Sequence, residues 1–254
     1  MLTITNFRDI GGIKNQEGKE IKKNVFLRSG ELSNLTKEDE QRLATNYRLG
    51  KIIDLRSEAE VEERPDKPVP EAEYIHIDIL EDIQDEGASI GDFVKIGSPE
   101  KSASYMEKLY SDIALNSVAQ KGYTQFFEHV LNLENQESLL FHCFAGKDRT
   151  GIAALLLLET LNTPREAIYT DYLLTNKLRQ KENAWILEQA KNAQQLEASN
   201  LEALQVALNV DKSYLDNFYQ TVEKQYGDIS AYLKQAIGID KGTKEIINQR
   251  FLVD

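Results

Sequence analysis

The chain has one cysteine, and it lies in a run of residues whose types suit the binding of a phosphate. The run is His142-Cys143-Phe144-Ala145-Gly146-Lys147-Asp148-Arg149-Thr150-Gly151. The apolar segment 138–142 leads into Cys143, and another apolar segment follows the run, so we expect a strand, a tight loop and the N-terminus of a helix. Backbone N–H groups at such a terminus point at one centre, and the helix dipole adds positive charge there. A dianionic phosphate fits this centre.

Two residues of the run could carry the reaction. Arg149 stands six residues after Cys143, so a loop curled around an anion would bring its guanidinium to the same centre. Arginine can bind two phosphate oxygens at once, which lysine cannot do. The same positive field favours the thiolate of Cys143 near neutral pH. A thiolate can attack phosphorus and form a covalent intermediate that water later hydrolyses.

The remaining residues of the run have supporting functions in this interpretation. We expect the loop from Phe144 to Arg149 to bind the phosphate oxygens, and Thr150 to donate a hydrogen bond to the sulfur. His142 is expected to fix the loop and tune the thiolate. Lys147 either adds charge at the rim of the pocket or is an ordinary solvated lysine. The full list of predicted phosphate-binding residues is Phe144, Ala145, Gly146, Lys147, Asp148 and Arg149.

A buried structural cysteine is the alternative interpretation. A lone cysteine at the end of an apolar strand is more often a small core residue than a nucleophile. Three charged residues among the six that follow Cys143 argue against this, because a core cysteine has no use for them.

The elements around the run indicate an α/β fold with a central, mostly parallel or mixed sheet flanked by helices. β-type segments occur at 2–5, 24–28, 51–56, 74–79 and 138–143. Helical segments lie between them, one of which begins at Thr36 and ends near Gly50. After Cys143 the sequence predicts helices and no further strand. We expect one domain over 1–254, with additional C-terminal helices that form a lid or projection over about 177–210.

The segment 81–104 shows no sustained periodicity. It contains Gly87, Gly91 and Gly97 among several aspartates. A long irregular segment within a compact domain is usually either functional or disordered, and both interpretations stay open here.

Composition limits the partners. The formal net charge is -12, which argues against nucleic-acid binding and against adhesion to anionic membranes. One cysteine excludes an intramolecular disulfide and a cysteine-rich zinc site, and the predicted chemistry needs no metal or cofactor. No apolar run approaches the length of a membrane helix, and no signal peptide is visible. The cytoplasm is the expected compartment, although export without a signal peptide would leave no mark in the sequence. Nothing in the sequence defines an oligomeric state.

The loop and several other segments resemble the protein tyrosine phosphatase superfamily. Cys-x5-Arg is the nucleophile loop of that superfamily. The longer pattern His-Cys-x-x-Gly-Lys-Asp-Arg-Thr-Gly is similar to a bacterial branch that includes tyrosine phosphatases with dual-specificity and phosphoinositide activity. The similarity extends nearly from end to end, through 6–12, 27–30, 54–57, 171–176 and 213–227. The resemblance implies a tyrosine-phosphatase-like fold and a phosphocysteine mechanism.

The leaving oxygen needs a general acid. Much of the superfamily uses an aspartate that follows Trp-Pro, but Trp185, the one tryptophan, is not followed by Pro-Asp. The resemblance places the acid at Asp148. Nearby cations favour the carboxylate form of Asp148, and a bound phosphate dianion would reverse this effect. Asp54, Asp78 and Asp82 are the alternatives.

The sequence therefore predicts a phosphatase. Phosphotyrosine is the leading substrate class, with phosphoserine and phosphothreonine as possible additions, so the partner is a phosphorylated protein. A phosphoinositide phosphatase is the second hypothesis, which the acidity of the chain and the non-basic Phe144 disfavour. A non-catalytic phosphate-binding module is the third, and the intact Cys143 and Arg149 argue against it. Ion pairs that brace the sheet behind the site are expected from Arg8, Asp9, Arg28, Asp54 and Arg56.

Overall fold

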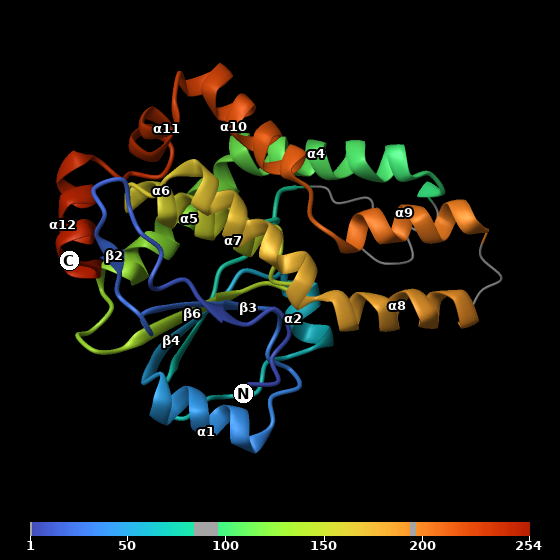
Figure 1. Ribbon diagram of the computed structural model, residues 1–254, viewed down its shortest axis with the longest axis horizontal. Coiled ribbons are helices and arrows are strands. Elements are labelled where there is room, and N and C mark those ends of the chain that lie inside the picture. Colours follow the sequence, from blue (N-terminus) through green and yellow to red (C-terminus); the bar gives the residue numbers. More distant parts are fainter. Residues whose placement is uncertain (1, 84–95, 194–196) are drawn as a thin grey trace.

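The computed structural model describes residues 2–83, 96–193 and 197–254. Within these ranges a β-sheet is enclosed by helices (Figure 1). The strands are β1 Arg8–Asp9, β2 Glu20–Ile21, β3 Phe26–Ser29, β4 Leu49–Asp54, β5 Glu73–His76, β6 Ser138–His142 and β7 Leu252–Val253. The helices are α1 Lys37–Asn46, α2 Glu58–Glu63, α4 Pro99–Leu115, α5 Ser117–Leu131, α6 Arg149–Thr160, α7 Arg165–Leu178, α8 Gln180–Ala193, α9 Ala198–Leu208, α10 Lys212–Tyr226, α11 Ile229–Gln235 and α12 Lys241–Phe251. The predicted α/β class is confirmed.

The main sheet brings the ends of three strands to one edge. Its strand order is β1-β3-β6-β4-β5, in which β1 is antiparallel to β3 and the other neighbours are parallel. Ser29 of β3 and Asp54 of β4 both pair with His142 of β6. The carboxyl ends of these parallel strands therefore meet at one place. Open α/β sheets commonly bind their ligands at this edge.

Helices cover both faces of the sheet, and alternating side chains explain why. On β6, Leu139 and Phe141 join the larger hydrophobic cluster, under α5 and α6, whereas Leu140 joins a smaller cluster with Leu43 of α1. Adjacent β4 residues divide in the same way, with Ile52 in the smaller cluster and Ile53 in the larger one. Strands that are buried on both faces read as continuous apolar runs, which is why these segments were predicted as strands.

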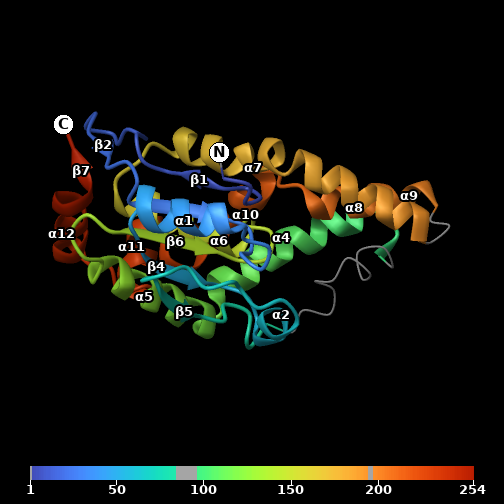
Figure 2. The same cartoon turned by 90° about the horizontal axis from the view of Figure 1, so that it is seen from below.

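The C-terminal helices extend the molecule in one direction. α8 and α9 extend away from the sheet beside α4 in both views (Figures 1 and 2). α4 packs against α9 and α10, and α8 packs against α9. The helical projection expected over 177–210 thus corresponds to the end of α7 together with α8 and α9.

Three predictions about individual elements are wrong. Residues 2–5 form no strand; Leu2 and Ile4 pack on the smaller cluster, and Asn6, with a φ of 58°, turns the chain before β1. The helix from Thr36 ends at Asn46, because Arg48 has a φ of 51° and β4 begins directly afterwards. A strand does follow Cys143, because β7 pairs with β2. This strand has only two residues, which are too few to form a recognisable sequence pattern.

The segment 81–104, expected to be irregular, is only partly described. Residues 84–95 lie outside the described ranges. α4 begins at Pro99, so the last part of the segment is helical and the prediction is wrong there. Proline at the first position of a helix is favourable because its missing N–H has no intrahelical partner.

Candidate active site

The predicted nucleophile lies at the carboxyl edge of the sheet, between β6 and α6. Cys143 directly follows β6, and only 1% of its surface is exposed. Asp148 stands at the N-cap position of α6, and Arg149 is its first residue. The described chain thus has the strand, loop and helix N-terminus that the sequence predicted around this cysteine.

The loop packs closely against the end of β3 at Gly146. Gly146 has a φ of 67°, and a Cβ atom there would lie 2.1 Å from the carbonyl oxygen of Ser29. The left-handed conformation and the close approach both exclude a side chain. Glycine is required at this position for the loop to turn back on β3.

Three consecutive carbonyl groups of the loop are held from outside it. Glu31 N–H donates to the Phe144 oxygen at 3.1 Å, Asn6 and Arg179 donate to the Ala145 oxygen at 3.2 and 3.0 Å, and Asn6 and Arg28 donate to the Gly146 oxygen at 2.8 and 3.0 Å. In a planar trans peptide the C=O and N–H groups point in opposite directions. Carbonyl groups held outward therefore turn the next N–H groups toward the inside of the loop, as an anion site requires.

Asp171 of α7 connects two arginines behind the loop. Its carboxylate lies 2.6 Å from Nε of Arg8 and 2.6 Å from Nη1 of Arg28. Burial alone would raise the pKa of Asp171, but the two guanidinium groups outweigh burial and lower it. The charged Asp171 thereby holds Arg28, which in turn holds the Gly146 carbonyl.

The expected bracing ion pairs form at four of five positions. Arg8 and Arg28 pair with Asp171, and Arg56 pairs with Asp54 at 2.6 Å. The prediction is wrong for Asp9, whose described contacts are with backbone N–H groups. Its carboxylate accepts from Gly11 and Asn24, at 2.8 and 2.7 Å, because Asp9 lies where the chain turns beside the short strand β1.

Glu60 is a site residue that the sequence analysis missed. Nη1 and Nη2 of Arg149 donate to the two carboxylate oxygens of Glu60, at 2.5 and 2.8 Å. Burial alone would raise the pKa of Glu60, but the hydrogen bonds and charge of Arg149 lower it. Ser57 and Glu60 form a capping box that starts α2. The Ser-x-x-Glu spacing predicts that helix start, but only the fold reveals the partner Arg149.

Asp148, the predicted acid, is held by two neighbours. Nζ of Lys147 lies 2.8 Å from one carboxylate oxygen, and the Tyr110 hydroxyl donates to the other at 2.9 Å. Tyr110 in turn shares a hydrogen bond of 2.6 Å with the hydroxyl of Tyr172. Lys147 is only 6% exposed, so its interpretation as a solvated loop lysine is wrong.

The alternative acids have other contacts. Asp54 is fully buried; desolvation would raise its pKa, but His142 and Arg56 lower it to about 2, so Asp54 holds no proton near neutral pH. Asp78 accepts from the backbone N–H groups of Glu58 and Leu80. Asp82 is exposed on the surface. Asp148 is itself part of the phosphate loop, whereas the contacts described for Asp54, Asp78 and Asp82 are with other groups. We therefore keep Asp148 as the predicted acid.

His142 and Thr150 flank the nucleophile and arginine. His142 is fully buried, and its Nδ1 lies 3.2 Å from the carbonyl oxygen of Cys143. The hydroxyl of Thr150 is buried and has no hydrogen-bond partner within the described part of the chain. It is therefore available for the bond to sulfur that was predicted from the sequence.

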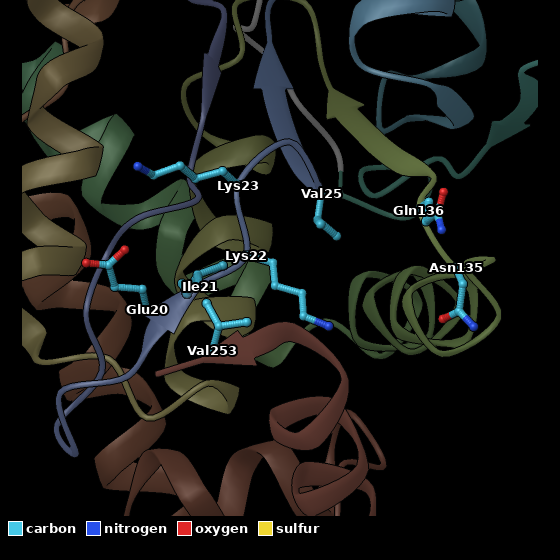
Figure 3. A pocket seen from close by; sticks show the side chains of 8 residues that line it. All are labelled: Glu20, Ile21, Lys22, Lys23, Val25, Asn135, Gln136 and Val253. Atoms are coloured by element: carbon cyan, nitrogen blue, oxygen red, sulfur yellow. The ribbon is translucent and has the colours of Figure 1, made fainter.

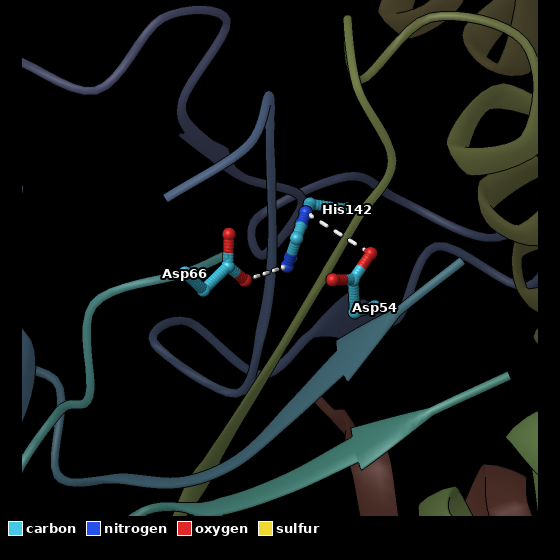
Figure 4. A group of neighbouring side chains, drawn as sticks. All are labelled: Asp54, Asp66 and His142. Carbon is cyan, nitrogen blue, oxygen red and sulfur yellow. Dashed lines mark ion pairs between the residues drawn. The ribbon is translucent and has the colours of Figure 1, made fainter. Parts of the chain in front are cut away.

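Asp54, Asp66 and His142 converge closely enough to resemble a metal-binding group (Figure 4). Arg56 already supplies a cation there. Its Nη2 donates to Asp54 at 2.6 Å and to Asp66 at 2.8 Å. We therefore interpret the cluster as a buried ion-pair network.

One open cavity lies away from this site. It measures about 760 Å³ and is open to solvent, between β2, β7 and the turn before β6 (Figure 3). Asn135 and Gln136 line it, and they precede β6, whereas Cys143 follows β6. The cavity is thus at the opposite end of that strand and has no part in the predicted chemistry.

Comparison with known proteins identifies the family of the chain. A model of the tyrosine phosphatase family matches residues 1–253. The chain is 29% identical to the triple specificity protein phosphatase PtpB of Mycobacterium tuberculosis, over 94% of this chain and 93% of that protein. It is 28% identical to a Cupriavidus necator protein provisionally named as a tyrosine-protein phosphatase, over 94% of this chain and 83% of that protein. A Nostoc commune tyrosine-protein phosphatase is 29% identical over 59% of this chain and 48% of its own length.

The chain belongs to the tyrosine phosphatase family, because the family model spans nearly all of it. The predicted membership of the tyrosine phosphatase superfamily is thereby confirmed. Among the described helices, none is both long and apolar enough to span a membrane.

Proposed function

We propose that the protein is a cysteine-dependent phosphomonoester hydrolase that acts on phosphotyrosine, and also on phosphoserine and phosphothreonine, through a phosphocysteine intermediate. The observation that carries this proposal is the position of Cys143 at the start of a loop whose carbonyl groups are held outward, with Arg149 at its end. Membership of the tyrosine phosphatase family supports it.

In the first step Sγ of Cys143 attacks phosphorus as a thiolate. The S–P bond forms, and the bond from phosphorus to the leaving oxygen breaks. Asp148 gives its proton to that oxygen, so a neutral phenol or alcohol departs. Arg149 and the inward N–H groups of the loop stabilise the charge on the three phosphate oxygens, and Glu60 fixes the plane of the guanidinium.

In the second step water attacks the phosphocysteine. Asp148, now a carboxylate, takes a proton from this water, and the P–S bond breaks to release inorganic phosphate. Thr150 donates a hydrogen bond to the departing sulfur and stabilises the thiolate. The cycle uses only groups of this chain and requires no metal.

Substrate binding must also free Asp148 for proton transfer. In the structure Lys147 and Tyr110 both donate to the carboxylate of Asp148. A bound phosphate dianion attracts Lys147 and repels a second negative charge nearby. Phosphate binding therefore favours the protonated carboxyl group that the first step needs.

The Cys143→Ser variant tests this function. We expect phosphate release from a phosphotyrosine peptide to fall to background, because the serine hydroxyl is not ionised at neutral pH. Circular dichroism and phosphopeptide binding should stay near those of the wild type, which separates lost chemistry from lost fold. Undiminished phosphate release would rule out the cysteine mechanism.

Phosphoinositides are the second candidate substrates. The Mycobacterium tuberculosis relative is a triple specificity protein phosphatase, which supports more than one substrate class for this chain. The net charge of -12 and Phe144 beside the nucleophile disfavour a lipid headgroup at an anionic membrane. Measurements of kcat/KM on phosphotyrosine peptides and on phosphoinositides, at one pH, show which substrate class is preferred. A higher kcat/KM for the lipids would reverse our assignment.

A further inference from the structure

Both ring nitrogens of His142 face acceptors, as the side chains in Figure 4 show. Nε2 lies 2.8 Å from Oδ2 of Asp66, within ion-pair distance although not in line for a hydrogen bond. Nδ1 lies 3.2 Å from the carbonyl oxygen of Cys143 and 3.8 Å from Oδ1 of Asp54. The imidazole is fully buried.

This arrangement fits only one protonation state of the ring. A neutral imidazole has one N–H group and one lone pair, and the lone pair would then face an oxygen at one of the two nitrogens. An imidazolium ion has an N–H group at each nitrogen, so its Nδ1–H can donate to the Cys143 carbonyl while its positive charge lies within ion-pair distance of Asp66. The geometry thus points to a positively charged histidine next to the nucleophile.

The surrounding charges are compatible with this state. Asp54 on β4 and Asp66 after α2 supply two negative charges, and Arg56 supplies one positive charge to both of them. Tyr74 on β5 donates to Asp54. The carboxylate of Glu31 lies 3.9 Å from Nη1 of Arg56. With His142 charged the central four groups are neutral together, whereas a neutral ring would leave a buried carboxylate without a counter-charge.

We propose that Asp66 is a positioning residue that keeps His142 charged and thereby favours the thiolate form of Cys143. Asp66 lies at Nε2, whereas the Cys143 carbonyl lies at Nδ1, so the imidazole stands between the Asp66 carboxylate and the backbone of the nucleophile. A neighbouring imidazolium is one of the features that promote cysteine ionisation. The proposal rests on the proposed function of Cys143 as nucleophile.

The acid–base balance of the ring supports this inference. Burial alone would lower the pKa of His142. The carboxylates of Asp54 and Asp66 outweigh burial and raise this pKa to about 9. His142 therefore stays protonated through the neutral range.

Asp66→Asn removes the charge with little change in shape. Asparagine Oδ1 can still accept from Leu32 N–H and Arg56, as Asp66 does at 2.9 and 2.8 Å. Its NH2 group would face Nε2 of His142 and can donate only to a lone pair. The variant should therefore hold His142 as the neutral Nδ1–H form, which can still donate to the Cys143 carbonyl.

The charge of the ring can be read directly by NMR. In the wild type, the imidazole signals of His142, assigned by their loss in His142→Asn, should remain those of an imidazolium at pH 7.5. In Asp66→Asn they should be those of a neutral ring. A neutral His142 in the wild type would overturn the proposal even if the variant failed to fold.

Alkylation by iodoacetate reads the effect on the nucleophile. The pH midpoint of Cys143 alkylation should rise by roughly half a unit in Asp66→Asn. Glu58→Gln is the matched control, because Glu58 is an exposed carboxylate of α2 outside the charged group around His142, and it should leave the midpoint unchanged. An unchanged midpoint in Asp66→Asn would refute the proposal while leaving the phosphatase function intact. Failure of that function would appear separately, as an active Cys143→Ser.

Discussion

Individual charged residues at the site come in pairs, in which a carboxylate fixes an arginine that either binds the predicted phosphate or holds the loop around it. Glu60 holds Arg149, and Asp171 holds Arg28. Arginine has many rotamers, so a fixed guanidinium loses less entropy when it binds an anion. The partners of the predicted catalytic groups should therefore matter for rate almost as much as the groups themselves.

Glu60→Gln tests the pair at Arg149. Glutamine keeps the capping box that starts α2, but it loses the charge and one of the two acceptors for Arg149. We expect kcat/KM for a phosphotyrosine peptide to fall by about 10- to 100-fold with little change in stability. Glu58→Gln, an exposed change in the same helix, serves as the control and should have wild-type activity. Equal rates in the two variants would show that Arg149 needs no partner.

Asp148→Ala tests the assignment of the general acid. Aryl phosphates with good leaving groups need little proton transfer, so the variant should hydrolyse them nearly as fast as the wild type. Alkyl and poor aryl leaving groups should be slowed by about 100-fold or more. The measurement is kcat/KM over a series of leaving groups. Uniform slowing across the series would move the acid to another residue.

At the scale of elements, α2 and the irregular segment after it contact both ends of the phosphate loop. Glu60 in α2 binds Arg149, and Asp66 in the irregular segment after α2 lies against His142. Between them, Arg64 lies over the Phe144 ring, 5.3 Å from its centroid. One short segment of the chain therefore positions the groups on both sides of Cys143.

Gly146→Ala tests the packing of the loop on β3. A positive φ costs an alanine about 1–2 kcal/mol, and its Cβ would also collide with the backbone at Ser29. We expect activity to fall by about 100-fold, because the loop must move by a large part of an ångström. Gly227→Ala is the matched control, since Gly227 has a φ of 94° and open space around it. Its free energy of unfolding in urea should fall by a similar amount, because of the positive φ, but its activity should be that of the wild type. Equal activity in both variants would contradict the packing argument.

At the scale of the whole molecule, the features that depend on local sequence patterns were predicted, whereas those that depend on long-range contacts were not. The five residues of β6 and the run into α6 were visible because apolar periodicity, glycines and charges are local signals. Glu60 and Asp66 were missed because their partners lie 89 and 76 residues away, and only the parallel pairing of β4 with β6 brings them together. The two-residue strands β1 and β7 were missed because tertiary pairing, not intrinsic propensity, makes them strands.

The buried network around His142 should also make stability depend on pH. Because the pKa of His142 in the folded state is raised from 6.5 to about 9, its contribution is complete below about pH 6.5 and is lost as pH rises through about 9. The loss is on the order of 3 kcal/mol. Urea unfolding at several pH values in this range should show the decline, and His142→Gln should flatten it. A wild-type profile as flat as that of the variant would mean that His142 does not titrate in this range.

The phosphocysteine is the central claim of the account, and rapid-quench mass spectrometry tests it directly. The enzyme is mixed with a phosphotyrosine peptide, stopped in acid during the first turnover, and digested. We predict one added phosphoryl group on the peptide that contains Cys143, absent in Cys143→Ser. Turnover without any phosphoryl group on that peptide, or with the group on another residue, would contradict the account.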